Sequence, residues 1–143
     1  MAETQATGWD HFPHEGDVGV RGHGDTLAEA FENAARALTS IIVPLDLVEQ
    51  REVVTVTCEG SDPDYLLLDW LNAVIFEMAT RGALFSGFTV EITGNGLRGE
   101  MRGEPVDVTR HEPSVEPKGA TLTELRVAQG VDGRWVAQCV VDV

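Results

Sequence analysis

The stretch "SDPDYLLLDWLNAVIFEMATRG" (residues 61–82) decides the fold class, because it predicts a helix that is buried on most sides. Ser61 or Asp62 can cap its start, Pro63 suits a first helical turn, and Gly82 suits its end. Its apolar residues cover most of the helix circumference: Leu66, Leu67, Leu68, Trp70, Leu71, Val74, Ile75, Phe76 and Met78. Such a helix is expected at the centre of a domain.

A second helix is predicted upstream of this central one. The segment "DTLAEAFENAARALTSII" (residues 25–42) places apolar residues at helical spacing. Thr26 and Glu29 fit a capping box, which satisfies free backbone N–H groups at a helix start. Pro44 comes next and predicts that the helix has ended by that point.

Strands are predicted on both sides of the central helix. Apolar and polar residues alternate in "EVVTVTC" (52–58) and "FTVEIT" (88–93). Between "FTVEIT" and "LRGEMRG", Asn95-Gly96 suggests a hairpin turn of type I′, which needs positive φ angles. Farther along, Asp132-Gly133 gives a similar hairpin signal between "TLTELRVA" (121–128) and "RWVAQCVVD" (134–142).

The order of these elements predicts an α+β fold. It begins with a strand that opens at Asp17, continues helix, strand, helix, and closes with about four strands. This order favours a two-layer sandwich of two helices on one mostly antiparallel β-sheet. We expect one domain over residues 1–143, with residues 1–10 flexible.

Composition narrows the classes of partner and compartment. The 143 residues include 10 Lys and Arg against 24 Asp and Glu, a net charge of -14. This charge repels phosphate backbones, so direct stable nucleic-acid binding is not expected, and proteins or cations are the favoured partners. Cys58 and Cys139 have no CxxC spacing and lie in apolar runs, which favours free thiols in a reducing compartment. Without a leader-like or membrane-spanning stretch, we expect a cytoplasmic protein with no membrane association.

Two short motifs place an aspartate at the outer end of a predicted strand. "GDV" (16–18) opens the first strand and "VDV" (141–143) closes the last, with Asp17 and Asp142 on the more polar side of each. If these strands are antiparallel neighbours, both carboxylates and the carboxylate of Val143 meet, and each pair repels by about 4 kcal/mol. Hard cations such as Ca²⁺, Mg²⁺ or Mn²⁺ relieve such clusters. Spacing alone favours another interpretation, in which Asp17 is a turn residue at the strand start and Asp142 is a solvated end charge.

Four segments together resemble the archease family. They occur in the family's order, as "HEGDVGVRGHGDTLAEAFENAARAL" (14–38), "LLLDWLNAVIFE" (66–77), "RGEPVDVTRHEPSVEPKGAT" (102–121) and "VVDV" (140–143). The resemblance implies a non-enzymatic activator of the RtcB-type tRNA-splicing RNA ligase, which promotes transfer of GMP from GTP to the ligase. It also implies a metal site, best suited to Ca²⁺, at Asp17, Asp142 and Val143.

Further residues are expected to support this site or to contact a partner. Supporting or partner contacts are expected from His14, Glu15, His111 and Lys118. The family commonly has Thr-Ala where this chain has Glu15-Gly16, so Glu15 adds either a further ligand or a surface charge, and the surface charge is favoured.

Other interpretations of the same residues remain open. A transition-metal cluster could form from His11, His14, His23, Asp17 and Asp25, although their spacing matches no compact ligand motif. Acid/base chemistry at His111 with Glu104, Asp107 and Lys118 lacks a recognisable nucleophile, so a loop surface that contacts a partner is favoured there. The alternative function is a small metal-dependent hydrolase, or a chaperone-like binding module, that uses the same acidic end.

Overall fold

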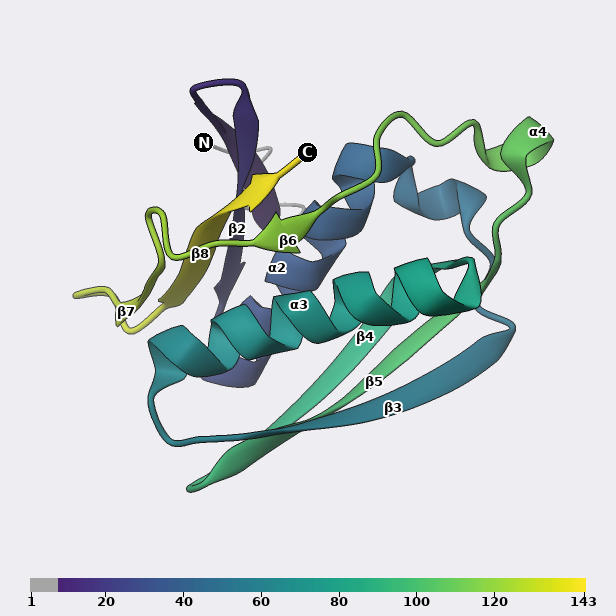
Figure 1. Cartoon of the computed structure of the whole chain (residues 1–143). Coiled ribbons are helices and arrows are strands. Elements are labelled where there is room, and N and C mark those ends of the chain that lie inside the picture. Colours follow the sequence, from purple (N-terminus) through teal and green to yellow (C-terminus); the bar gives the residue numbers. More distant parts are fainter. Residues whose placement is uncertain (1–7) are drawn as a thin grey trace.

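The computed structural model describes residues 8–143, and its strands form two antiparallel sheets (Figure 1). Sheet A has the order β1 (Trp9–His14), β2 (Asp17–Gly24), β8 (Trp135–Asp142) and β6 (Gly119–Ala120), and β7 (Arg126–Gln129) also pairs with β8. Sheet B has the order β3 (Glu52–Glu59), β5 (Gly96–Pro105) and β4 (Ala83–Thr93). The helical segments are α2 (Leu27–Ile42), η1 (Leu45–Leu47), α3 (Pro63–Arg81) and α4 (Val108–His111).

The predicted α+β class with antiparallel strands is confirmed, but the expected single sheet is two sheets. Side chains of α2 explain the division, because they occupy the outer edge of β4. The Glu32 carboxylate accepts a hydrogen bond from the Val90 N–H at 2.8 Å, and the Thr39 hydroxyl donates to the Phe85 carbonyl at 2.6 Å. A strand edge whose N–H and C=O groups already have hydrogen-bond partners has few groups free to pair with another strand.

The two long helices begin and end close to the predicted positions. Thr26 caps α2 by accepting a hydrogen bond from the Glu29 N–H at 3.1 Å. Asp62, rather than Ser61, caps α3 through the Asp64 N–H, and Gly82 ends the helix in the left-handed conformation at φ 61°. Figure 1 shows α3 running across sheet B and α2 lying beside β2.

The core is built around α3, although one face of this helix is open to solvent. Trp70 is fully buried, and its indole N–H donates to the Phe31 carbonyl at 3.1 Å. Its ring meets the Phe88 ring edge to face, with 6.1 Å between the centroids. Phe76, which the apolar pattern placed in the buried circumference, is 61% exposed. The prediction of burial fails there because no element among residues 8–143 covers the outer face of α3.

The strand β1 was not predicted, and it forms a hairpin with β2. Its loop is Glu15-Gly16, with positive φ angles of 47° and 89°. Residues 1–7 of the segment expected to be flexible lie outside the described residues, whereas Trp9 and Asp10 belong to β1.

The hairpin between β4 and β5 is confirmed, but its predicted turn type is wrong. Thr93 pairs with Gly96, so the loop is Gly94-Asn95, and neither Asn95 nor Gly96 has a positive φ. The later hairpin signal is confirmed: β7 and β8 are joined across Gly133, which has a φ of 84°.

Both cysteines are free thiols, as predicted. Burial raises the pKa of the Cys139 thiol to about 12, which keeps it protonated and unreactive near neutral pH. Over the part of the chain that the structure describes, no helix is both long and apolar enough to cross a membrane.

Candidate metal-binding site

Asp17 and Asp142 meet because β2 and β8 are antiparallel neighbours. Val18 lies opposite Val141 in this pairing, so the next residue of each strand, outward from that pair, is an aspartate. The Val143 N–H donates a hydrogen bond to Asp17 Oδ1 at 3.2 Å. The predicted adjacency of the strands that carry Asp17 and Asp142 is therefore confirmed, and in Figure 1 the C-terminal end of β8 lies beside β2. We call Asp17 and Asp142 the acidic pair.

The acidic pair is partly exposed to solvent, and no cationic side chain of residues 8–143 compensates its charge. Asp142 is exposed and Asp17 is partly buried. Among residues 8–143, neither carboxylate forms an ion pair with a Lys, Arg or His side chain. The main chain of Lys118 lies next to the pair, because its N–H donates to the Asp142 carbonyl at 2.8 Å. Two neighbouring anions without a cation attract a positive ligand.

The donor atoms at the acidic pair suit a hard cation but are few in number. Carboxylate and main-chain oxygens are the ligands that Ca²⁺, Mg²⁺ and Mn²⁺ prefer. In the described part of the chain, no group of three or more His, Cys, Asp or Glu side chains is placed to hold a metal ion. The acidic pair supplies two such side chains, and Val143 can add only main-chain oxygen. A cation bound here would keep several coordination positions for water or a partner.

His14 and Glu15 lie at the same end of sheet A as the acidic pair. His14 is directly opposite Asp17 in the β1–β2 hairpin, so the two residues are cross-strand neighbours. Glu15 occupies the turn, its side chain is 87% exposed, and its carboxylate lies 3.8 Å from His14 Nδ1. Protonation of His14 would create an ion pair with Glu15 and place one positive charge beside Asp17.

The alternative transition-metal cluster is wrong, because its members have other partners. His11 Nε2 lies 2.7 Å from the Ala37 carbonyl of α2. His23 Nε2 lies 3.2 Å from Asp10 Oδ1, and Asp25 forms an ion pair with Arg134 at 2.6 Å. These residues therefore do not gather around Asp17.

His111 belongs to a buried cluster and does not form a partner surface. It is 1% exposed, and its Nδ1 accepts a hydrogen bond from the Asp107 N–H at 2.8 Å. Its Nε2 must then carry the proton that it donates to Glu104 Oε2 at 3.0 Å. Arg110 completes this Glu104 cluster with a 2.7 Å hydrogen bond to Glu104 Oε1. The prediction of a surface role for His111 is wrong because the buried Glu104 charge needs these donors.

The Glu104 cluster is expected to make the fold sensitive to acid. Hydrogen bonds from Arg110, and next from the Glu49 N–H, lower the pKa of Glu104 from 4.5 to about 2. Because the folded pKa lies below the unfolded one, this stabilisation is present above pH 4.5 and is lost as the pH falls towards 2. Urea unfolding at about pH 6.5 and about pH 3 measures how much unfolding free energy is lost on acidification. This loss should be smaller in Glu104→Gln than in the unmodified chain.

The matched control for this measurement is Glu112→Gln, since Glu112 is an exposed glutamate just beyond the same cluster. Its acid dependence should equal that of the unmodified chain. Identical acid dependence in Glu104→Gln would mean that Glu104 is not the titrating group.

Comparison with known proteins places the chain among archease sequences. The family model described as "Archease protein family (MTH1598/TM1083)" matches residues 9–143. "Protein archease" of Pyrococcus abyssi is 39% identical over 139 residues, which cover 94% of this chain and 98% of the relative. "Protein archease" of Methanopyrus kandleri is 40% identical over 139 residues, covering 94% and 99%.

Solved structures support the same fold. The solution structure of Methanobacterium thermoautotrophicum protein 1598 has a TM-score of 0.85 at 33% sequence identity, covering 96% of this chain and 99% of that one. The crystal structure of an archease from Thermotoga maritima, at 17% identity and a TM-score of 0.63, covers 92% and 94% and shares the fold.

Proposed function

The chain belongs to the archease family, and from this membership we propose that it activates an RtcB-type RNA ligase as a metal-binding partner protein. In this proposal the ligase performs the chemistry, in tRNA splicing or RNA repair. This chain promotes the GTP-dependent guanylylation that prepares the ligase for each turnover. The proposal assigns no catalytic residue to the chain itself.

The observation that carries the proposal is the acidic pair at an exposed end of sheet A. Asp17 and Asp142 come from distant parts of the sequence, yet β2 and β8 bring them side by side without a cation partner from residues 8–143. Because neither carboxylate takes part in a salt bridge within residues 8–143, a cation can bind here without breaking an ion pair. A docking surface that carries them can approach a site rich in cations or metal ions.

Ca²⁺ is the proposed ion, with Mg²⁺ or Mn²⁺ as alternatives, held by Asp17, Asp142 and the main-chain oxygens of Val143. When bound, the ion would supply positive charge and open coordination positions for carboxylate or phosphate oxygens of the partner complex. The Val143 N–H fixes one oxygen of Asp17 and leaves the other oxygen of that carboxylate available. His14 and the exposed Lys118 are proposed to tune the charge around the acidic pair.

Guanylylation of the ligase tests the proposal directly. The cognate ligase would be incubated with radiolabelled GTP and increasing amounts of this protein, and the covalent ligase–GMP adduct measured over time. Asp17→Asn and Asp142→Asn each keep the side-chain shape but remove a charge, and are expected to slow adduct formation at least about tenfold. Asp46→Asn is the control, because Asp46 is an exposed aspartate in η1.

Full guanylylation with both acidic-pair variants would refute the role of the acidic pair. Calorimetric titration with Ca²⁺ separates metal binding from docking, because both variants should also bind the ion more weakly. Hydrolysis of nucleotides or phosphoesters by this protein alone would instead favour the alternative of a small metal-dependent hydrolase.

A further inference from the structure

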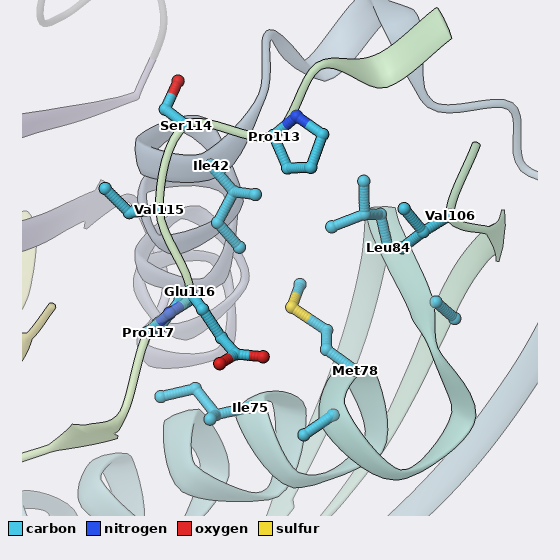
Figure 2. Close-up of a pocket in the computed structure, with 12 residues that line it drawn as sticks. Ile42, Ile75, Met78, Leu84, Val106, Pro113, Ser114, Val115, Glu116 and Pro117 are labelled. Atoms are coloured by element: carbon cyan, nitrogen blue, oxygen red, sulfur yellow. The ribbon is translucent and has the colours of Figure 1, made fainter. Parts of the chain in front are cut away.

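The structure also contains a cavity that neither residue of the acidic pair lines. A cavity of about 500 Å³ opens between the C-terminal parts of α2 and α3, the start of β4, and the segment of residues 112–118 (Figure 2). We call this segment, which joins α4 to β6, the strap. The cavity's volume falls within the range of pockets that hold small molecules.

The walls of this cavity are mostly apolar. Ile42 comes from α2, Ile75 and Met78 from α3, Leu84 from β4, and Val106 from the segment after β5. In Figure 2 the Met78 side chain projects between Leu84 on one side and Ile75 on the other. A methionine thioether adapts its shape to a ligand and makes favourable contacts with aromatic rings. These walls suit an aromatic or short alkyl group.

One charged group faces this apolar surface. Figure 2 shows the Glu116 carboxylate pointing from the strap into the cavity, towards Ile75 and Met78. Among the described residues, this carboxylate has no hydrogen-bond or ion-pair partner. A carboxylate at the mouth of an apolar cavity attracts a cation and repels an anion, and the net charge of -14 acts in the same direction.

Main-chain hydrogen bonds near both of its ends anchor the strap beside the cavity. The Ser114 N–H donates to the Ile42 carbonyl at 2.9 Å, and the Lys118 N–H donates to the Asp142 carbonyl at 2.8 Å. Pro113 directly precedes Ser114 and Pro117 directly precedes Lys118, so a proline ring restricts the backbone next to each of these hydrogen bonds. Glu116 is therefore presented on a segment that is anchored before and after it.

We propose that this cavity binds a small lipophilic amine, a molecule with an aromatic or short alkyl body and one protonated amino group. The body fills the space lined by Ile75, Met78 and Leu84, and the amino group pairs with the Glu116 carboxylate. Repulsion from the same carboxylate weakens the binding of carboxylic acids of the same shape. The site is separate from the acidic pair and requires neither a metal ion nor a ligase.

Three probes of similar shape and different charge test this site. The ¹⁵N-labelled full-length protein would be titrated with 2-phenylethylamine, 2-phenylethanol or 3-phenylpropionate, and amide chemical shifts followed by NMR. The amine should shift the amides of Ile75, Met78 and Ser114 in a saturable manner. The alcohol should bind about fivefold more weakly, and the propionate more weakly still, because an exposed ion pair contributes up to about 1 kcal/mol.

Two variants and one control assign the effect to the cavity. Glu116→Gln should abolish the preference for the amine over the alcohol, whereas Glu112→Gln, a change in the strap outside the lining, should leave the preference intact. Ala79→Leu places a larger side chain at the cavity wall and should weaken all three probes. Equal affinities for amine and alcohol, or shifts confined to other residues, would overturn the proposal. All measurements use this protein alone, so their outcome does not depend on whether the protein activates a ligase.

Discussion

Replacement of Trp70 by alanine is expected to lower the free energy of unfolding by about 3–5 kcal/mol, the usual cost of removing a large buried aromatic side chain. Trp70 is fully buried in α3, and its ring contacts Phe88 of sheet B. The change also leaves the Phe31 carbonyl of α2 without the indole donor at 3.1 Å. A single side chain thus joins both long helices to sheet B. Urea unfolding followed by circular dichroism measures the loss.

Phe76→Ala provides the matched control for Trp70→Ala. Phe76 is an aromatic residue of the same helix but is 61% exposed. Its replacement should change the free energy of unfolding by about 0.5 kcal/mol or less. Comparable losses in the two variants would mean that α3 is not buried as described.

Gly22→Ala is expected to destabilise the contact between β2 and α2 by about 1–3 kcal/mol, the cost of overpacking a filled core. A Cβ atom at Gly22 would lie 2.2 Å from the Ala30 carbonyl oxygen and 2.3 Å from the Ala34 nitrogen. Both obstructing atoms are helix backbone, so no side chain can rotate away and α2 itself must move. We therefore expect the upper part of this range, measured as a lower urea midpoint.

The control for this prediction is Gly94→Ala in the loop between β4 and β5. No atom within 4 Å would meet a Cβ there, and Gly94 has no positive φ that would strain an alanine. Its stability should remain close to that of the unmodified chain. A loss at Gly94 as large as that at Gly22 would contradict the steric explanation.

Local signals in the sequence predict the helices well. The side chains of Thr26 and Asp62 accept hydrogen bonds from backbone N–H groups two or three residues later, so each helix start is visible in the local sequence. The spacing of apolar residues then indicates how far each helix extends. Strand β1 escapes prediction because Pro13 interrupts its alternation and its loop begins with Glu15, which is an uncommon residue at positive φ. An edge strand tolerates such a proline, since one of its sides needs no partner.

Features that depend on contacts between distant segments could not be predicted in this way. The division into two sheets rests on Glu32 and Thr39, which look like ordinary polar residues of α2 until β4 lies beside them. The burial of His111 depends on a charge at Glu104 that is itself buried.

The candidate site shows the same limit. Residue spacing placed each aspartate on the polar side of its strand but left open whether the two strands meet. That adjacency is a property of the whole sheet. The resemblance to a family therefore carried the prediction of the site residues, and the register of β2 with β8 supplied the geometry.

The pairing of β2 with β8 also has a consequence for folding kinetics. Asp17 and Val143 are 126 positions apart, whereas β4 and β5 are joined by a loop of Gly94 and Asn95. Closing the longer loop has the larger entropic cost, so the β4–β5 hairpin is expected to form first and the centre of sheet A later. The acidic pair is then absent from any folding intermediate that contains only sheet B. A ligand of this pair can recognise only molecules in which sheet A has closed.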